Sequence, residues 1–205
     1  MQEYNEQEFE YDYFINSSIS NYQDYLQKKY NMLAEEIIWE LKIKEKDNVL
    51  DFGCATGALL KEFKKRGYKN IIGTDISVWA IEYGKNHFGM KNNLKHYSLD
   101  LLTTENDWIF FLDVLEHMND PELNRIFKIL SKHKPNKGVV VRIPVSLDEG
   151  ENYAYEISRN DKTHIQCHSK KWWLKFFKKY KFKFSKVFLS QNIYDSKGVL
   201  AWVIK

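Results

Sequence analysis

VLDFGCATG, at residues 49–57, is an apolar strand that ends on a carboxylate and runs into a turn spaced by glycines. A second carboxylate, Asp75, follows Asp51 after 24 positions, at the end of the next apolar run. A strand, a glycine turn, a helix and a downstream acidic residue together are typical of a site for an adenosine-containing ligand. The stretch therefore predicts an α/β fold with its ligand at the carboxyl ends of the strands.

The turn itself separates two kinds of adenosine ligand. A dinucleotide site needs closely spaced glycines, so that backbone N–H groups and a helix N-terminus can approach the pyrophosphate. Here Ala55 stands at the second glycine position, and Asp51 puts a negative charge just ahead of the turn. That carboxylate would repel a pyrophosphate but would attract a ligand with an ammonium and a sulfonium group. S-adenosylmethionine is such a ligand.

Four segments support this interpretation, and they follow one another in the order VLDFGCATG (49–57), GTDIS (73–77), LDL (99–101) and FLDVLEH (111–117). With them the chain resembles the class I S-adenosylmethionine-dependent methyltransferases from about residue 35 to its end. The resemblance implies S-adenosylmethionine as the cofactor and a methyltransferase as the enzyme. The alternative is a nucleotide-binding α/β domain without methyl transfer.

Strand and helix patterns alternate along the chain, which predicts parallel strands joined by crossover helices. We expect a three-layer, Rossmann-like sheet of seven strands, mostly parallel, with an antiparallel C-terminal hairpin and helices on both faces. The expected strands are residues 48–52, 70–74, 94–97, 108–112, 138–143, 182–190 and 199–204. The expected helices are residues 59–66, 78–87, 121–132 and 170–180, and residues 144–169 form a long connection without clear periodicity.

A length of 205 residues fits one domain with one core. We expect a single methyltransferase domain over residues 1–205, with a catalytic α/β core at 41–205. Residues 1–40 would form a helical N-terminal extension, with a helix near 22–39 that either closes over the ligands or covers the sheet. This segment is rich in tyrosine, with Tyr4, Tyr11, Tyr13, Tyr22, Tyr25 and Tyr30.

Composition bears on partners and compartment. The net charge of +3 is too small to indicate a polyanion partner, although lysines gather among aromatic residues at 170–186. Helical spacing there predicts an amphipathic helix with a lysine-rich solvent face, and RNA contact is the alternative. Two cysteines, Cys54 and Cys167, give no disulfide framework, and no apolar run is long enough for a membrane span. We expect a cytoplasmic protein without a signal peptide; its oligomeric state stays open.

The cofactor contacts are expected at successive strand ends. Gly53 and Gly57 would let the backbone approach the methionine moiety, and Asp51 would attract its ammonium. Asp75 would accept hydrogen bonds from both ribose hydroxyls, because a carboxylate offers two oxygens. The remaining predicted contacts are the turn residue Ala55, Ile76 on the adenine face, Asp100 and Leu101 at the adenine edge, and Asp113 and Val114 beside the sulfonium.

Histidines decide which acceptor chemistry is open, because a hydroxyl acceptor usually needs a general base at neutral pH. His117 follows the fourth strand, and His164 lies in the connection after the fifth strand. Both are candidate catalytic bases. The His164-x-x-x-His168 spacing could suggest a metal, but the segment lacks helical periodicity and no third ligand is evident nearby, so we expect no metal.

The expected function is methyl transfer to oxygen, with nitrogen as the second choice, of a small-molecule, sugar-derivative or biosynthetic-intermediate acceptor. The chain lacks the Asn/Asp-Pro-Pro-aromatic tetrapeptide of nucleic-acid amino methyltransferases and has Asp113-Val114-Leu115-Glu116 at that place. This argues against a nucleic-acid partner. Two alternatives stay open: an RNA or protein methyltransferase, and a non-catalytic cofactor-binding partner protein.

Overall fold

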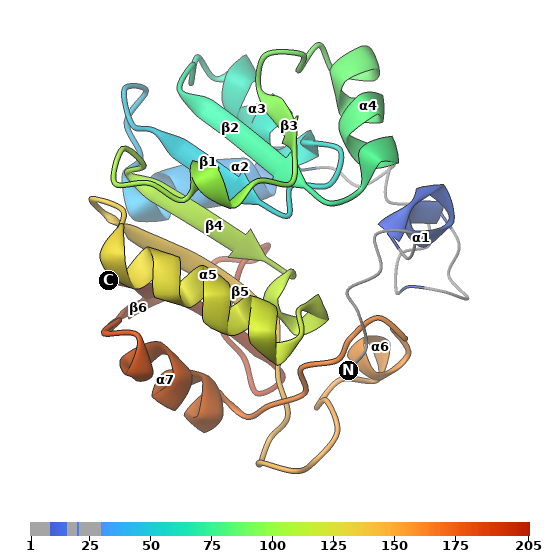
Figure 1. The fold of residues 1–205 in the computed structure, drawn as a ribbon, viewed down its shortest axis with the longest axis vertical. Helices are drawn as coiled ribbons and strands as arrows, with labels where there is room; N and C mark the ends of the chain where they lie inside the picture. Colours follow the sequence, from blue (N-terminus) through green and yellow to red (C-terminus); the bar gives the residue numbers. More distant parts are fainter. Residues whose placement is uncertain (1–8, 16–19, 21–29) are drawn as a thin grey trace.

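The structure is a computed structural model that describes residues 9–15, 20 and 30–205. Its centre is a seven-stranded sheet in the order β3-β2-β1-β4-β5-β7-β6 (Figure 1). Strands β1 to β5 run parallel, and β7 pairs antiparallel with both β5 and β6. This confirms the predicted mixed sheet and its C-terminal hairpin. The strands are β1 Val49–Phe52, β2 Ile71–Asp75, β3 Leu94–His96, β4 Trp108–Leu112, β5 Gly138–Pro144, β6 Phe184–Val187 and β7 Val199–Ile204.

The strand order places a switch point between β1 and β4. From β1 the chain moves outward to β2 and β3, then returns to pair β4 with the other side of β1. The segments that leave β1 and β4 at their carboxyl ends therefore turn away from each other. A crevice opens at such a point, and ligands of open α/β sheets bind there.

Helices cover both faces of the sheet, because side chains of successive strand residues point to opposite sides. In β4, Ile109 and Phe111 pack in one hydrophobic cluster with α5 and α7, whereas Trp108 and Phe110 pack in a second cluster with α2 and α3. The result is three layers, which Figure 1 shows with α5 and α7 on the same side of the sheet. The helices are α1 Tyr11–Ile15, α2 Asn31–Leu41, α3 Ala58–Lys65, α4 Val78–His87, α5 Asp120–Lys132, α6 Glu156–Arg159 and α7 Lys170–Lys179, with two 3-10 turns, η3 Leu99–Leu101 and η4 Leu115–His117.

Three expectations differ in detail from the structure. The strand expected over 182–190 is shorter and covers only Phe184–Val187, with a register shift between Phe184 and Lys186 in its pairing with β7. The connection over 144–169 contains the short helix α6. The helix expected over 22–39 is described only as α2, while residues 22–29, and with them Tyr22 and Tyr25, lie outside the described residues, as does Tyr4. Of the helices that the structure describes, none has the length and apolar character to cross a membrane.

Candidate active site

A cavity lies where β1 and β4 end. It spans about 880 Å³, its open mouth included, which is within the range of cavities that hold a small ligand. Seven of the ten cofactor contacts expected from the sequence line it: Asp51, Gly53, Ala55, Asp75, Ile76, Asp113 and Val114. The candidate base His117 lines it too.

The glycine turn holds its shape through the neighbouring strand. Gly53 donates its N–H to the carbonyl of Thr74 at 2.8 Å, and Ala55 donates to the Asp75 carboxylate at 2.7 Å. Gly53 and Ala55 both have positive φ, at 82° and 48°. A Cβ on Gly53 would come within 2.4 Å of a methyl group of Val114, so the turn can lie against the end of β4 only with glycine at this position.

The Asp75 side chain is buried and held in place. One carboxylate oxygen accepts from the N–H of Ala55, and the other accepts from the N–H of Ser77 at 2.9 Å. Burial raises the pKa of Asp75, and these two N–H groups oppose the rise. Each oxygen retains lone pairs for a ligand, so the arrangement fits the predicted contact with two ribose hydroxyls.

Asp51 is the buried carboxylate ahead of the turn, with 4% of its surface exposed. Burial, with a further contribution from the charge of Asp75, raises the pKa of Asp51 to about 7, against the opposing effect of Arg142. A cation bound in the cavity would favour the ionised form. Arg142 itself is engaged by Asp113, since its Nε lies 2.9 Å from both carboxylate oxygens. Asp113 has a φ of 57°.

The charge and polarity of the cavity lining suit S-adenosylmethionine. Among the described lining residues, Arg142 is the only lysine or arginine, and the acidic side chains face the space. Such a wall suits a ligand with a positive charge and hydroxyl groups, and it disfavours a pyrophosphate. The apolar side chains that complete the wall suit an adenine ring; they include Phe9, Phe14, Leu33, Ile76 and Met118.

Three predicted contacts do not line the cavity. Gly57 starts α3 with a φ of 72° and lies close to Leu94. Asp100 is exposed and Leu101 half-buried, both in the 3-10 turn η3. Tyr97, which follows β3 directly, lines the cavity at this edge. Contacts of Asp100 and Leu101 with adenine therefore stay predictions.

The described part of the N-terminal segment lies over the cavity. Phe9 packs edge-on against the ring of His117 at 5.5 Å, and Phe14 stacks on Trp79 at 5.4 Å. Glu10 accepts from the N–H groups of Val78 and Trp79, both at 3.2 Å, at the start of α4. The segment 9–15, which we call the strap, is thus anchored to α4 and covers the crevice with aromatic side chains.

A second cavity adjoins the first and holds both candidate bases. It spans about 820 Å³, its mouth included, and shares with the first cavity Tyr13, Asp113, His117 and Arg142. The connection after β5 reaches it because the carbonyl of Glu116 accepts from the N–H groups of Ile165 and Gln166 at 2.8 and 3.0 Å.

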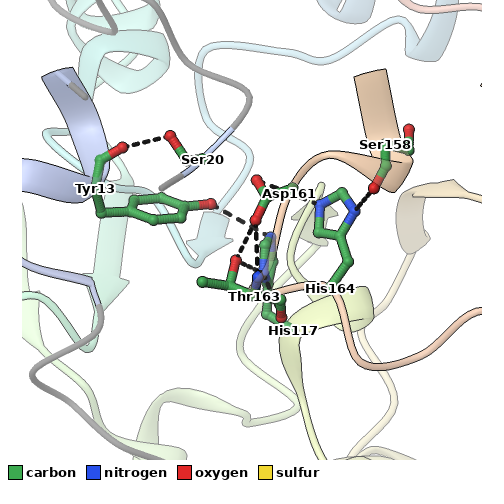
Figure 2. Close-up of polar contacts among 7 residues, drawn as sticks. All are labelled: Tyr13, Ser20, His117, Ser158, Asp161, Thr163 and His164. Atoms are coloured by element: carbon green, nitrogen blue, oxygen red, sulfur yellow. Dashed lines mark hydrogen bonds and ion pairs between the residues drawn. The ribbon is translucent and has the colours of Figure 1, made fainter. Parts of the chain in front are cut away.

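Figure 2 shows how the two histidines are oriented. His117 Nδ1 lies 3.2 Å from the carbonyl oxygen of Thr163, and His164 Nδ1 lies 2.8 Å from that of Ser158. A carbonyl can only accept, so each Nδ1 carries the hydrogen and each neutral ring keeps a lone pair on Nε2. The ring centroids are 4.7 Å apart.

Burial dominates the electrostatics of this cluster. It lowers the pKa of His117 to about 4, with a further contribution from His164, and it lowers the pKa of His164. Asp161 opposes both shifts. Burial also raises the pKa of Glu116 well above its usual range, with a contribution from Asp113. Both histidines are therefore neutral at pH 7.

Comparison with known proteins agrees with this geometry. The family described as "Methyltransferase domain" matches residues 19–186. The chain belongs to this methyltransferase family, and S-adenosylmethionine is its cofactor. A comparison with curated proteins gave no match.

Solved structures share the fold. An S-adenosylmethionine-dependent methyltransferase from Clostridium acetobutylicum ATCC 824 superimposes with a TM-score of 0.63 and 18% identity, over 95% of each chain. The methyltransferase domain of bacterial CtHen1 gives 0.61 and 19%, over 86% of this chain and 99% of that one. Mitomycin 7-O-methyltransferase MmcR gives 0.60 and 12%, over 88% of this chain and 55% of that one.

Several residues that line the two cavities were not predicted from the sequence. Arg142 lies within an apolar strand and has no motif around it. Phe9 and Phe14 belong to a segment without periodicity, although the density of tyrosines there did suggest a cover. Glu116 stands beside His117 in the motif FLDVLEH, and that adjacency was the available signal.

Proposed function

We propose that this enzyme transfers the methyl group of S-adenosylmethionine to a hydroxyl oxygen of a small-molecule acceptor. One observation carries the proposal: the first cavity, whose lining suits the cofactor, shares four wall residues with a second cavity that both His117 and His164 line. An acceptor in the second cavity would lie against these shared residues, next to the space that suits the cofactor.

The cofactor supplies an activated methyl group, and the residues of the two cavities would align the acceptor with it and exclude water. Asp75 and Asp51 would hold the ribose and ammonium ends of the cofactor. The strap would exclude water through Phe9 and Tyr13. A hydroxyl acceptor would pass its proton to a neutral imidazole of the second cavity, His117 or His164, as its oxygen bonds to the methyl carbon, and the carbon–sulfur bond would break with its electron pair left on sulfur.

The size and cover of the second cavity favour a small acceptor over a macromolecule. The lysines of α7 lie on a helix whose apolar face, with Trp173, Phe176 and Phe177, packs into the core under the sheet. None of the α7 residues lines either cavity. This supports the amphipathic-helix interpretation of residues 170–186 over an RNA-contacting one. MmcR, which shares this fold, is a mitomycin 7-O-methyltransferase, and this supports an oxygen acceptor.

The direct test is incubation of the protein with labelled S-adenosylmethionine and a fractionated small-molecule extract, followed by mass analysis of what gains a methyl group. Asp75→Ala is the matched negative control. We expect a labelled small molecule whose added methyl group is ether- or ester-linked. Label on nitrogen would correct the acceptor atom. Label only in RNA or protein would overturn the proposal, and cofactor binding without transfer to any fraction would favour a non-catalytic role.

A further inference from the structure

The second cavity contains a group whose burial the cofactor does not explain. Glu116 is fully buried, and among the residues that the structure describes neither of its carboxylate oxygens has a hydrogen-bond partner. A buried carboxylate without partners is costly, and native structures retain one mainly where an ion or ligand completes it. Asp75, by contrast, receives two backbone N–H groups. Glu116 lines the second cavity, and one of its carboxylate oxygens lies within 4.8 Å of a ring nitrogen of each of the two histidines.

We propose that Glu116, His117 and His164 bind a divalent transition-metal ion. One ligand atom from each residue, a carboxylate oxygen and two imidazole nitrogens, lies within 4.8 Å of the others. Ligand atoms around a tetrahedral ion are about 3.4 Å apart, from bond lengths of about 2.1 Å. Side-chain rotations that move each ligand atom by about an ångström would therefore bring the three atoms to the spacing that a tetrahedral ion requires.

The orientation of the histidines is that of metal ligands. A metal-binding histidine usually donates its other ring N–H to a carbonyl or carboxylate, which fixes the ring and its tautomer. His117 and His164 do so through Nδ1, to the carbonyls of Thr163 and Ser158. Nε2 of His117 lies 3.5 Å from the Tyr13 hydroxyl and Nε2 of His164 lies 3.7 Å from a carboxylate oxygen of Asp161, and the ion would replace these two long contacts. Asp161 supports this arrangement, because it accepts from the hydroxyl of Thr163 at 2.6 Å (Figure 2).

The ligand set also selects the kind of ion. Mg²⁺ and Ca²⁺ prefer oxygen ligands throughout, whereas two imidazoles with one carboxylate suit Mn²⁺, Fe²⁺, Co²⁺ or Zn²⁺. Three protein ligands leave a coordination position open, as in catalytic sites. Because all three residues line the second cavity, an acceptor bound there would lie close to that position.

The role of the ion in the reaction rests on the proposed function, methyl transfer to a hydroxyl oxygen. An acceptor hydroxyl bound at the open position would lose its proton to water more readily, since a bound divalent ion lowers the pKa of a coordinated O–H group. Its oxygen would then bond to the methyl carbon while the carbon–sulfur bond breaks toward sulfur. His117 and His164 would hold the ion instead of accepting a proton, which departs from the roles and the absence of a metal expected from the sequence.

Cobalt titration of the purified chain tests the site without any acceptor. We expect one equivalent of Co²⁺ to bind with visible absorption bands, and a large excess of Mg²⁺ to leave them unchanged. Glu116→Gln and His164→Ala should weaken binding by at least about tenfold. His168→Ala is the matched control, because His168 contacts Glu149 and Gln166 and stacks on Trp172, away from both cavities. S-adenosylhomocysteine affinity reports that each variant is folded.

Equal Co²⁺ binding by wild type and Glu116→Gln would overturn the site. Full methyl transfer after the metal is removed by a chelator would overturn the role of the ion in the reaction. Failure of the proposed function looks different. A chain that binds Co²⁺ through Glu116 but methylates no small molecule would retain the metal site and lose the O-methyltransferase assignment. Loss of Co²⁺ binding in His168→Ala as well would place the ion elsewhere and refute the proposal.

Discussion

Protonation of Asp51 should make cofactor binding depend on pH. The pKa of Asp51 is raised to about 7, so about 9% of the side chain is ionised at pH 6 and about 76% at pH 7.5. Only the ionised form attracts the ammonium group of the ligand. The affinity for S-adenosylhomocysteine should therefore rise about eightfold over this interval, with uptake of ligand coupled to release of a proton from Asp51.

Asp51→Asn removes the titration while keeping the shape of the side chain. The variant should bind S-adenosylhomocysteine more weakly at pH 7.5 and change by less than about twofold between pH 6 and pH 7.5. Isothermal titration calorimetry in buffers of different ionisation enthalpy measures both the affinity and the released proton. The pKa of His117, about 4, lies below this window, so its titration does not contribute.

Stability should change with pH in the opposite sense. A carboxyl whose pKa is raised by folding stabilises the protein fully below its unfolded pKa and loses that contribution as pH rises through the folded value. For Asp51 these values are 3.8 and about 7. The free energy of unfolding of wild type, relative to Asp51→Asn, should thus fall by about 2.5 kcal/mol from pH 5 to pH 7.5. A flat affinity in wild type, or the same slope in Asp51→Asn, would refute the assignment of the ammonium contact.

Three further predictions concern the turn, the ribose contact and the acceptor class. Gly84→Ala in α4 should lower the free energy of unfolding, measured by urea denaturation, by about 1–3 kcal/mol, because the new Cβ would lie 2.0 Å from the carbonyl oxygen of Thr56. In an exposed helix the same substitution would stabilise by about 1 kcal/mol. Asn86→Ala on the same helix is the control. Asp75→Ala should weaken S-adenosylhomocysteine binding by more than about tenfold, whereas the exposed Asp148→Asn should not, and unchanged calorimetric affinity in the first variant would contradict the ribose contact. The chain should pass through a heparin column at low salt, since a polyanion site would show strong, salt-dependent retention.

Most of the fold was predictable from local patterns. The bounds of α4, β4 and β7 agree with expectation to the residue, because an N-cap serine, an entirely apolar run and a turn with glycine mark them. The end of α3 was one residue off, which is usual for helix termini. Outer elements such as β6 were less predictable, since half-exposed edge strands have weak apolar patterning.

The residues of the candidate site that lie at the carboxyl ends of strands could be predicted from the sequence. Asp51, Asp75 and Asp113 follow apolar runs, and parallel strands bring their carboxyl ends to one edge. The environment of His164 was not predictable, because its position depends on two hydrogen bonds to the carbonyl of Glu116, 48 residues earlier than His164. Sequence spacing pairs His164 with His168, whereas the structure pairs it with His117.

Tyr13 lies in the walls of both cavities, and this has a consequence for turnover. Its ring contacts His117, and the strap that carries it is fastened to α4 through Glu10. Because one short segment borders both spaces, we expect the spent cofactor and the methylated acceptor to leave after the same opening movement. Exchange of the two ligands would then be kinetically linked, and substitutions that loosen the strap should change the release rates of both products together.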